Sequence, residues 1–197
     1  MMPRWLQFVV AGFVLGLAGC QPSVPPAFQS TDITGAEFAR DFNLTDHNGQ
    51  ARSLVAFKGK VVAIFFGYIH CPDVCPTTLS DFSAALKLLG AQADQVQVVF
   101  VTLDPQRDTP DLLKQFVPAF NPTFLGMYTD DEGLKRLAHE YKVVYQKTSV
   151  KSADSYLIDH SAGTYIYDPQ GRIRLLMPYG SSPEMIAHDL KILLPTP

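Results

Sequence analysis

The run Val61-Val-Ala-Ile-Phe-Phe-Gly-Tyr68, with the residues that follow it, decides the fold. It is a continuous apolar run of strand length, which is typical of a strand that is covered on both faces. Residues 77–89 then carry apolar side chains at helical spacing, and Pro76 suits the first turn of a helix. A buried strand that leads directly into a helix indicates an α/β domain.

The rest of the chain continues the alternation of strands and helices. Strands are predicted over residues 96–103 and 124–128, helices over 109–117, 132–141 and 182–193, and a hairpin over 164–177. The dipeptide Asn48-Gly49 predicts a further hairpin near the N-terminus. The prediction is therefore an α/β fold with a mixed central sheet flanked by helices and an N-terminal β-hairpin.

Composition excludes two broad classes of protein. Lys and Arg number 16 against 19 Asp and Glu, so there is no basic surplus for binding nucleic acid. With 47% hydrophobic residues, the chain has enough apolar surface to avoid disorder, and 197 residues suit one globular domain. The three cysteines cannot all pair within one chain, so each needs its own explanation.

The N-terminus has the pattern of an export signal. Arg4 precedes an uncharged apolar run over residues 5–18, which is short for a membrane span. The run ends in Leu17-Ala-Gly-Cys20, which resembles a bacterial lipobox. We therefore predict cleavage before Cys20 and lipid attachment to its thiol.

These features divide the chain into three parts. Residues 1–19 are the predicted lipoprotein signal peptide. Residues 20–37 are the lipidated cysteine and a flexible tether, whose prolines disfavour a regular helix or sheet. Residues 38–197 are the predicted folded domain.

Two cysteines lie between the first buried strand and its helix, in Cys71-Pro-Asp-Val-Cys75. The free N–H groups and positive dipole end of a helix N-terminus favour a thiolate, so we expect a lowered pKa and high reactivity there. At this spacing the two sulfurs can form a disulfide or share one metal ion. A purely structural disulfide would close only a short loop and would constrain the unfolded chain little.

Thiolates suit Cu(I) and also zinc, but two donors seldom complete a site, so a third ligand is expected. His160 is a candidate, because it lies at a loop-to-strand junction that an α/β sheet could bring toward the cysteines. His70 adjoins Cys71 but is expected to point to the opposite side, in a supporting or packing role. The remaining histidines, which we expect to be solvated, are His47, His139 and His188. The methionines expected in the core rather than at a metal are Met127, Met177 and Met185.

Three sequence elements together resemble the Sco (SenC) family of respiratory oxidase assembly proteins. They are Gly67-Tyr-Ile-His-Cys-Pro-Asp-Val-Cys-Pro76, Val101-Thr-Leu-Asp-Pro-Gln-Arg-Asp-Thr-Pro110 and Asp159-His160-Ser161. The resemblance extends over about residues 38–194 and implies a thioredoxin-like fold.

The resemblance also implies a site and a function. Copper, as Cu(I) or Cu(II), would be bound by Cys71, Cys75 and His160 and delivered to the dinuclear copper centre of cytochrome c oxidase. The two cysteines would form a redox-active pair. Asp159 would orient the histidine, reach the metal or cap a turn. The second element contains two acidic residues, Asp104 and Asp108. We expect them mainly to shape the loop and to cap the helix that follows.

The implied partners are the copper-site subunit of the oxidase, a periplasmic copper donor or thiol reductase, and a membrane bound through Cys20. This places the protein on the extracytoplasmic, periplasmic face of a bacterial membrane. An oxidase partner favours the inner membrane. Gln21, however, is not the aspartate that retains lipoproteins there in some bacteria, so the outer membrane stays open.

Two alternative functions use the same cysteines, which leaves open whether the protein is an enzyme. A thiol-disulfide reductase would keep the oxidase's copper-binding cysteines reduced and would not need His160. A peroxiredoxin-like peroxidase is less favoured, because the Thr-x-x-Cys context typical of such enzymes is missing around Cys71.

Overall fold

The computed structural model describes residues 27–152 and 155–195. Eight strands form one sheet in the order β1-β10-β9-β4-β5-β6-β2-β3, and two others form a separate β7-β8 pair. The strands are β1 Thr31–Asp32, β2 Asn43–Asp46, β3 Ala51–Ser53, β4 Val61–Gly67, β5 Val96–Thr102, β6 Leu125–Tyr128, β7 Tyr145–Ser152, β8 Ser155–His160, β9 Thr164–Tyr167 and β10 Ile173–Met177. The α-helices are α1 Val74–Leu89, α2 Pro110–Phe116, α3 Asp131–Glu140 and α4 Pro183–Leu193. β4 runs parallel to β5, and β5 to β6, whereas β4 is antiparallel to β9, so the sheet is mixed, as predicted.

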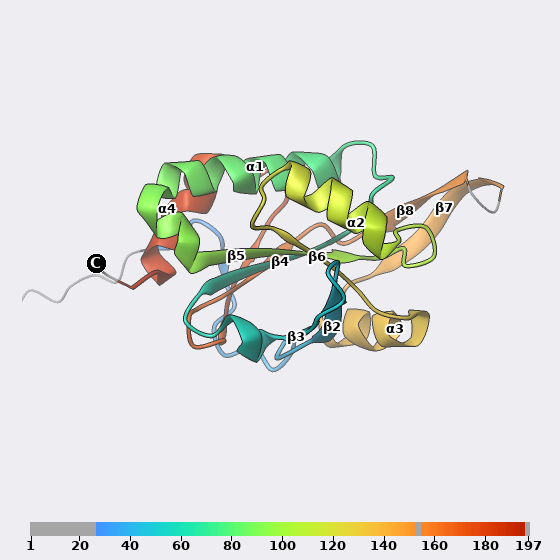
Figure 1. Cartoon of the computed structure of the whole chain (residues 1–197). Helices are drawn as coiled ribbons and strands as arrows, with labels where there is room; N and C mark the ends of the chain where they lie inside the picture. The colour runs from blue at the N-terminus through green and yellow to red at the C-terminus, as the bar shows by residue number, and fades with distance from the viewer. Residues whose placement is uncertain (1–26, 153–154, 196–197) are drawn as a thin grey trace, which may run out of the picture.

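Helices cover both faces of the main sheet. In Figure 1, α1, α2 and α4 lie on one face and α3 lies on the other. Strand β4 is buried on both sides, because alternate residues point to opposite faces. Phe65 packs with α1 and α4 in one apolar cluster, and Phe66 packs with α3 in the other. This double coverage explains why the strand reads as a continuous apolar run.

Most predicted elements are present at nearly the predicted positions. The N-terminal hairpin is β2-β3, and the later hairpin is β9-β10. The side chains of Thr109 and Ser182 each accept a backbone N–H as helix caps, as their sequence context predicts. Helix α1 begins at Val74, a few residues before the apolar pattern from residue 77, and Cys75 lies in its first turn, as predicted.

Two parts of the structure differ from the prediction. The hairpin β7-β8 was not predicted, and it lies outside the main sheet, projecting at one end of the molecule in Figure 1.

The folded domain also begins before the predicted boundary at residue 38. Strand β1 pairs with β10, and the backbone N–H groups of Gln29 and Ser30 donate to Asp189 at 2.9 and 2.8 Å. A two-residue polar strand has no apolar pattern by which the sequence could reveal it.

The predicted signal peptide, residues 1–19, and the predicted lipid attachment at Cys20 lie outside the described residues. The prolines of the predicted tether lie there as well. Within the part of the chain that is described, no helix has both the length and the apolar character needed to cross a membrane.

Candidate metal centre

The two thiols lie where β4 passes into α1, at the edge where the parallel strands β4 and β5 both end. Cys71 is half-buried in the connecting loop, and Cys75 is the second residue of α1 and fully buried in the core. The backbone N–H of Cys75 donates to the Cys71 sulfur at 3.4 Å. This N–H is one of the free donors of the helix start, so α1 directs it at the more exposed thiol. Both cysteines are free thiols.

Gly67, the last residue of β4, makes room for the buried sulfur. A Cβ atom at this position would lie 2.8 Å from Cys75 Sγ and 2.8 Å from the Phe100 ring. Such contacts are too short to be tolerated without movement, so the Cys75 position depends on glycine here. The sequence reasoning gave Gly67 no role. Its signal was a glycine in an apolar strand, which often marks a close approach.

His160 is the last residue of β8 and lies against the Cys75 thiol. Its Nε2 atom is 3.8 Å from Cys75 Sγ, and its ring stands nearly perpendicular to that of Tyr68, with centroids 6.1 Å apart. Its Nδ1 atom lies 2.9 Å from the carbonyl oxygen of Ser161. Because a carbonyl oxygen only accepts hydrogen bonds, this contact favours the neutral tautomer with the proton on Nδ1 and a lone pair on Nε2. The imidazole therefore presents a ligand atom toward the thiols.

Cys71, Cys75 and His160 form a cluster of potential metal ligands, with ligand atoms that all lie within 4.8 Å of one another. A metal such as zinc lies about 2.3 Å from a thiolate sulfur and about 2.0 Å from an imidazole nitrogen. Two ligands of one such ion can thus be separated by at most about 4.6 Å. The cluster fits a single ion after small side-chain shifts. Asp159 is exposed and is not a member of the cluster.

The buried thiol differs from expectation in its acidity. Burial raises the pKa of Cys75 well above the usual range for a thiol, and its hydrogen bond with Cys71 adds to the effect. The lowered pKa expected at the helix start was therefore wrong for Cys75. Loss of hydration in an apolar core outweighs the partial positive charge of the helix end.

The cluster opens into a surface cleft of about 400 Å³. Cys71 and His160 both line this cleft, and Pro72 and Leu157 supply apolar parts of its wall. Asp73 and Asp159 also line it. The ligand atoms of the more exposed residues are therefore accessible to a small molecule or to a partner protein.

The other histidines are not members of this cluster. His139 and His188 are exposed, as predicted. His70 is about half-exposed, and its Nδ1 atom lies 3.8 Å from a carboxylate oxygen of Asp108. His47 was predicted to be solvated, but it is buried, and its Nδ1 accepts the backbone N–H of Gly126 at 3.0 Å. Burial lowers its pKa. The prediction for His47 was wrong because β6 covers the first hairpin.

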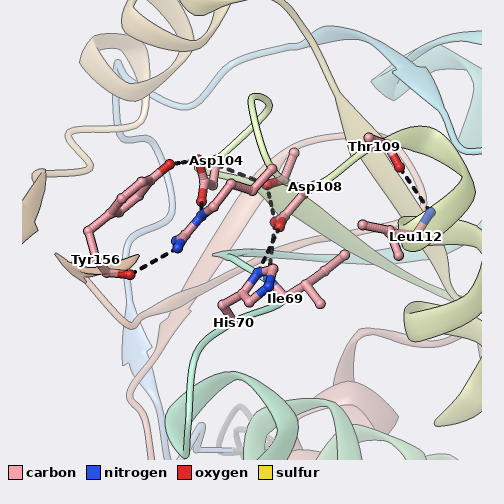
Figure 2. Close-up of polar contacts among 9 residues, drawn as sticks. Ile69, His70, Asp104, Asp108, Thr109, Leu112 and Tyr156 are labelled. Carbon is pink, nitrogen blue, oxygen red and sulfur yellow. Dashed lines mark hydrogen bonds and ion pairs between the residues drawn. The ribbon is translucent and has the colours of Figure 1, made fainter. Parts of the chain in front are cut away.

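The loop after β5 is architectural, as predicted for its two acidic residues. Asp104 and Asp108 are both 1% exposed. Figure 2 shows Asp108 between the Ile69–His70 segment and Asp104, with Thr109 capping the next helix through Leu112. The caps are supplied by Thr109 rather than by the aspartates.

Among the methionines, Met127 and Met177 are buried as expected, whereas Met185 is half-buried.

Comparison with known proteins places this site in a family. The sequence model of SCO1/SenC matches residues 30–194. A SCO2-like protein of Rickettsia felis is 35% identical over 152 residues, which are 77% of this chain and 74% of that protein. The copper-bound structure of Bradyrhizobium japonicum ScoI is 40% identical, with a TM-score of 0.72 over 78% of this chain and 98% of ScoI. Apo Sco1 from Thermus thermophilus is 36% identical, with a TM-score of 0.76 over 85% of this chain and 98% of that one.

The matched region contains every helix of the described chain and the whole of the Cys-Cys-His cluster. The similarity to these solved structures agrees with the thioredoxin-like α/β fold expected from the three sequence elements. Because the family model extends over most of the sequence, the chain belongs to the SCO1/SenC family.

Proposed function

We propose that this protein binds copper at Cys71, Cys75 and His160 and delivers it to the dinuclear copper centre of cytochrome c oxidase. The observation that carries the proposal is the cluster of two sulfur atoms and one nitrogen atom at an open cleft. The copper-bound ScoI of Bradyrhizobium japonicum supports copper as the metal. Membership of the family supports the oxidase as the destination, as the resemblance of the sequence elements implies.

The ligand set suits Cu(I) as a cargo. Two thiolates are soft ligands, and the imidazole adds a borderline nitrogen that also tolerates Cu(II). Cys75 must lose its proton when copper binds, since the raised pKa keeps the free thiol protonated. Three protein ligands leave the ion open toward the cleft. An acceptor with more sulfur and nitrogen ligands can then take the ion by exchanging one ligand at a time.

A copper titration tests this function. The reduced full-length protein, held in detergent, is titrated with Cu(I) against a coloured Cu(I) chelator and compared with Cys71→Ser and Cys75→Ser. We expect one tightly bound copper ion in the wild type and loss of competition with the chelator in each variant. Tight binding that survives removal of either cysteine would reject the three-ligand site. A parallel titration with zinc tests the choice of metal.

Delivery is tested in cells that lack the gene. We expect the oxidase in such cells to lose the signal of its dinuclear copper centre. The wild-type gene should restore the signal, and the His160→Ala gene should not. Full restoration of the signal by the His160→Ala gene would show that assembly of the oxidase centre does not depend on copper binding through His160, and would contradict the proposed delivery.

A thiol-disulfide reductase is a second candidate, and the accessibility of Cys71 favours it. The thiol of Cys71 lies at the cleft and receives a hydrogen bond from the start of α1, whereas Cys75 lies behind it. In this function Cys71 attacks a substrate disulfide, and Cys75 then displaces the reduced substrate, leaving a Cys71–Cys75 disulfide. Reductase activity that is unchanged in His160→Ala, together with lost copper affinity, would separate the two functions.

We also propose that the mature protein begins at Cys20, is anchored by lipid on that residue, and acts on the periplasmic face of the membrane. The lipobox pattern supports this, and the folded part begins close behind it, since Gln29 and Ser30 are already hydrogen-bonded to Asp189. Labelling cells with a radioactive fatty acid should label the wild-type protein and not Cys20→Ser. Equal labelling of both would contradict the anchor.

A further inference from the structure

The strand that carries His160 is outside the main sheet. Strand β8 pairs only with β7 among the strands of the described chain. Tyr156, Ile158 and His160 lie on the same face of β8, because alternate residues of a strand point the same way. Tyr156 is 6% exposed and Ile158 is 4% exposed, whereas Leu157 and Asp159 between them face solvent. The inward face of β8 thus carries two anchoring side chains followed by the ligand.

Tyr156 is held by two residues of the loop after β5. Its hydroxyl donates to Asp104 at 2.6 Å. The guanidinium of Arg107 lies over the tyrosine ring, 3.5 Å from the centroid, and its Nη1 donates to the Tyr156 carbonyl oxygen at 3.1 Å. Arg107 also pairs with Asp104. Figure 2 shows the polar contacts of the Tyr156 hydroxyl and carbonyl. With the guanidinium over the ring, the ring, the hydroxyl and the backbone of Tyr156 are all engaged.

The same loop also holds the segment that leads to the thiols. Asp108 accepts the backbone N–H of Ile69 at 3.0 Å and the hydroxyl of Thr102 at 2.6 Å. Ile69 is two residues before Cys71. Residues 104–108 therefore contact both segments that supply ligands: Asp104 binds Tyr156, and Asp108 binds Ile69 (Figure 2).

We propose that Tyr156, clamped by Asp104 and Arg107, is a positioning residue that fixes the reach and register of His160 over the two thiols. The proposal rests on the copper-binding function proposed above. Tyr156 precedes His160 by four residues, or about 13 Å along an extended strand. A slip of one residue would turn His160 to solvent and bring Asp159 inward, so the anchor decides which side chain meets the cysteines. The clamp contacts neither sulfur ligand directly: Cys75 lies in α1, and the segment before Cys71 is held by Asp108 rather than by Asp104 or Arg107.

A double-mutant cycle tests the clamp. The reduced full-length protein is titrated with Cu(I) in four forms: wild type, Tyr156→Phe, His160→Ala and the double variant. Tyr156→Phe removes only the hydroxyl that binds Asp104. We expect it to weaken Cu(I) binding about tenfold, as is typical when a group that orients a ligand is lost. In the His160→Ala background the same change should have no effect, since the residue acts through the imidazole.

Tyr165→Phe is the matched control. Tyr165 is also a buried tyrosine whose hydroxyl donates to a protein oxygen, but it lies in the apolar cluster on the opposite face of the sheet. It should cost comparable stability, measured as the unfolding midpoint, and leave copper affinity unchanged. A second variant, Arg107→Lys, keeps the positive charge but loses the planar stacking over Tyr156, and should also weaken binding only when His160 is present.

The outcomes separate the two proposals. If the wild type binds copper and His160→Ala weakens binding, but Tyr156→Phe behaves like Tyr165→Phe, the positioning role is rejected and the function stands. Equal losses for Tyr156→Phe with and without His160 would also reject it, because the effect would then be a general loss of structure. If the wild type fails to bind copper, or His160→Ala has no effect, the proposed function is rejected and the positioning role with it.

Discussion

The two halves of the candidate metal centre are built differently. The sulfur half lies at the junction of β4 and α1, where Cys75 is fully buried and Gly67 leaves just enough space for its sulfur. The nitrogen half is His160, at the end of a two-stranded hairpin outside the main sheet. Core packing fixes the first half directly. His160 is held through its strand, in which Tyr156 and Ile158 pack into the same apolar cluster as Cys75 and Tyr156 also binds Asp104 and Arg107.

This difference separates stability from ligand geometry. Disturbing the sulfur half disturbs the core, so it should cost folding free energy as well as copper affinity. Removing only the His160 side chain, which is not part of the buried apolar cluster, should change copper affinity and leave the fold intact.

The largest expected change in copper affinity without a change in fold is that of His160→Ala. Loss of the ligand itself should weaken Cu(I) binding by more than the roughly 10–100-fold that loss of an orienting partner costs. The unfolding free energy should stay within about 0.5 kcal/mol of the wild type, because the side chain is not buried in the core. Chelator competition and chemical denaturation measure the two quantities. The control is His139→Ala, an exposed histidine on α3; equal affinities for the two variants would show that His160 is not a ligand.

The next change, Gly67→Ala, disturbs the position of the Cys75 sulfur. The added Cβ would meet Cys75 Sγ and the Phe100 ring at 2.8 Å, so we expect a loss of about 1–3 kcal/mol in unfolding free energy. Copper affinity should fall as well, because the sulfur must move. Urea denaturation and copper titration report the two effects.

Gly126→Ala is the control for that experiment. Its Cβ would crowd Leu113 and Val117 at 3.1 Å, in the core but away from the thiols. It should lower stability by less and leave copper affinity as in the wild type. A Gly67→Ala protein with wild-type affinity would show that the sulfur position is not tightly fixed.

The smallest expected effect concerns pH and His47, which touches neither half. Burial holds the folded-state pKa of His47 below that of the unfolded chain, about 6.5, so the unfolded state binds the proton more readily. The stability contributed by neutral His47 is therefore present above the unfolded pKa and declines as pH falls from there toward the folded pKa. His47→Asn offers an oxygen in place of Nδ1 and should flatten the decline in this window. An unchanged pH profile of the unfolding midpoint would contradict this assignment.

The sequence predicted those features that depend on local pattern. The apolar runs of β4 and β5, and the caps at Thr109 and Ser182, lie where their side chains indicate. The position of the cysteine pair at the start of α1 was also predictable, because strand, loop and helix are contiguous in the chain.

Features that depend on distant packing could not be predicted in the same way. The hairpin β7-β8 is formed largely by polar residues, and the approach of His160 to Cys75 joins residues 85 apart in the sequence. The position of His160 at a loop-to-strand junction made it a candidate, and the family resemblance implied that it is a ligand. The acidity of Cys75 and the burial of His47 were both misjudged, because each follows from tertiary burial rather than from neighbours in the chain.

The central claim is that core packing supplies two sulfur ligands and the hairpin supplies one nitrogen ligand to the same copper ion. X-ray absorption spectroscopy of the Cu(I)-loaded wild type and His160→Ala proteins tests it most directly. We predict two sulfur neighbours and one imidazole nitrogen in the wild type, and two sulfur neighbours without the imidazole in the variant. An identical copper environment in the two proteins would contradict the claim.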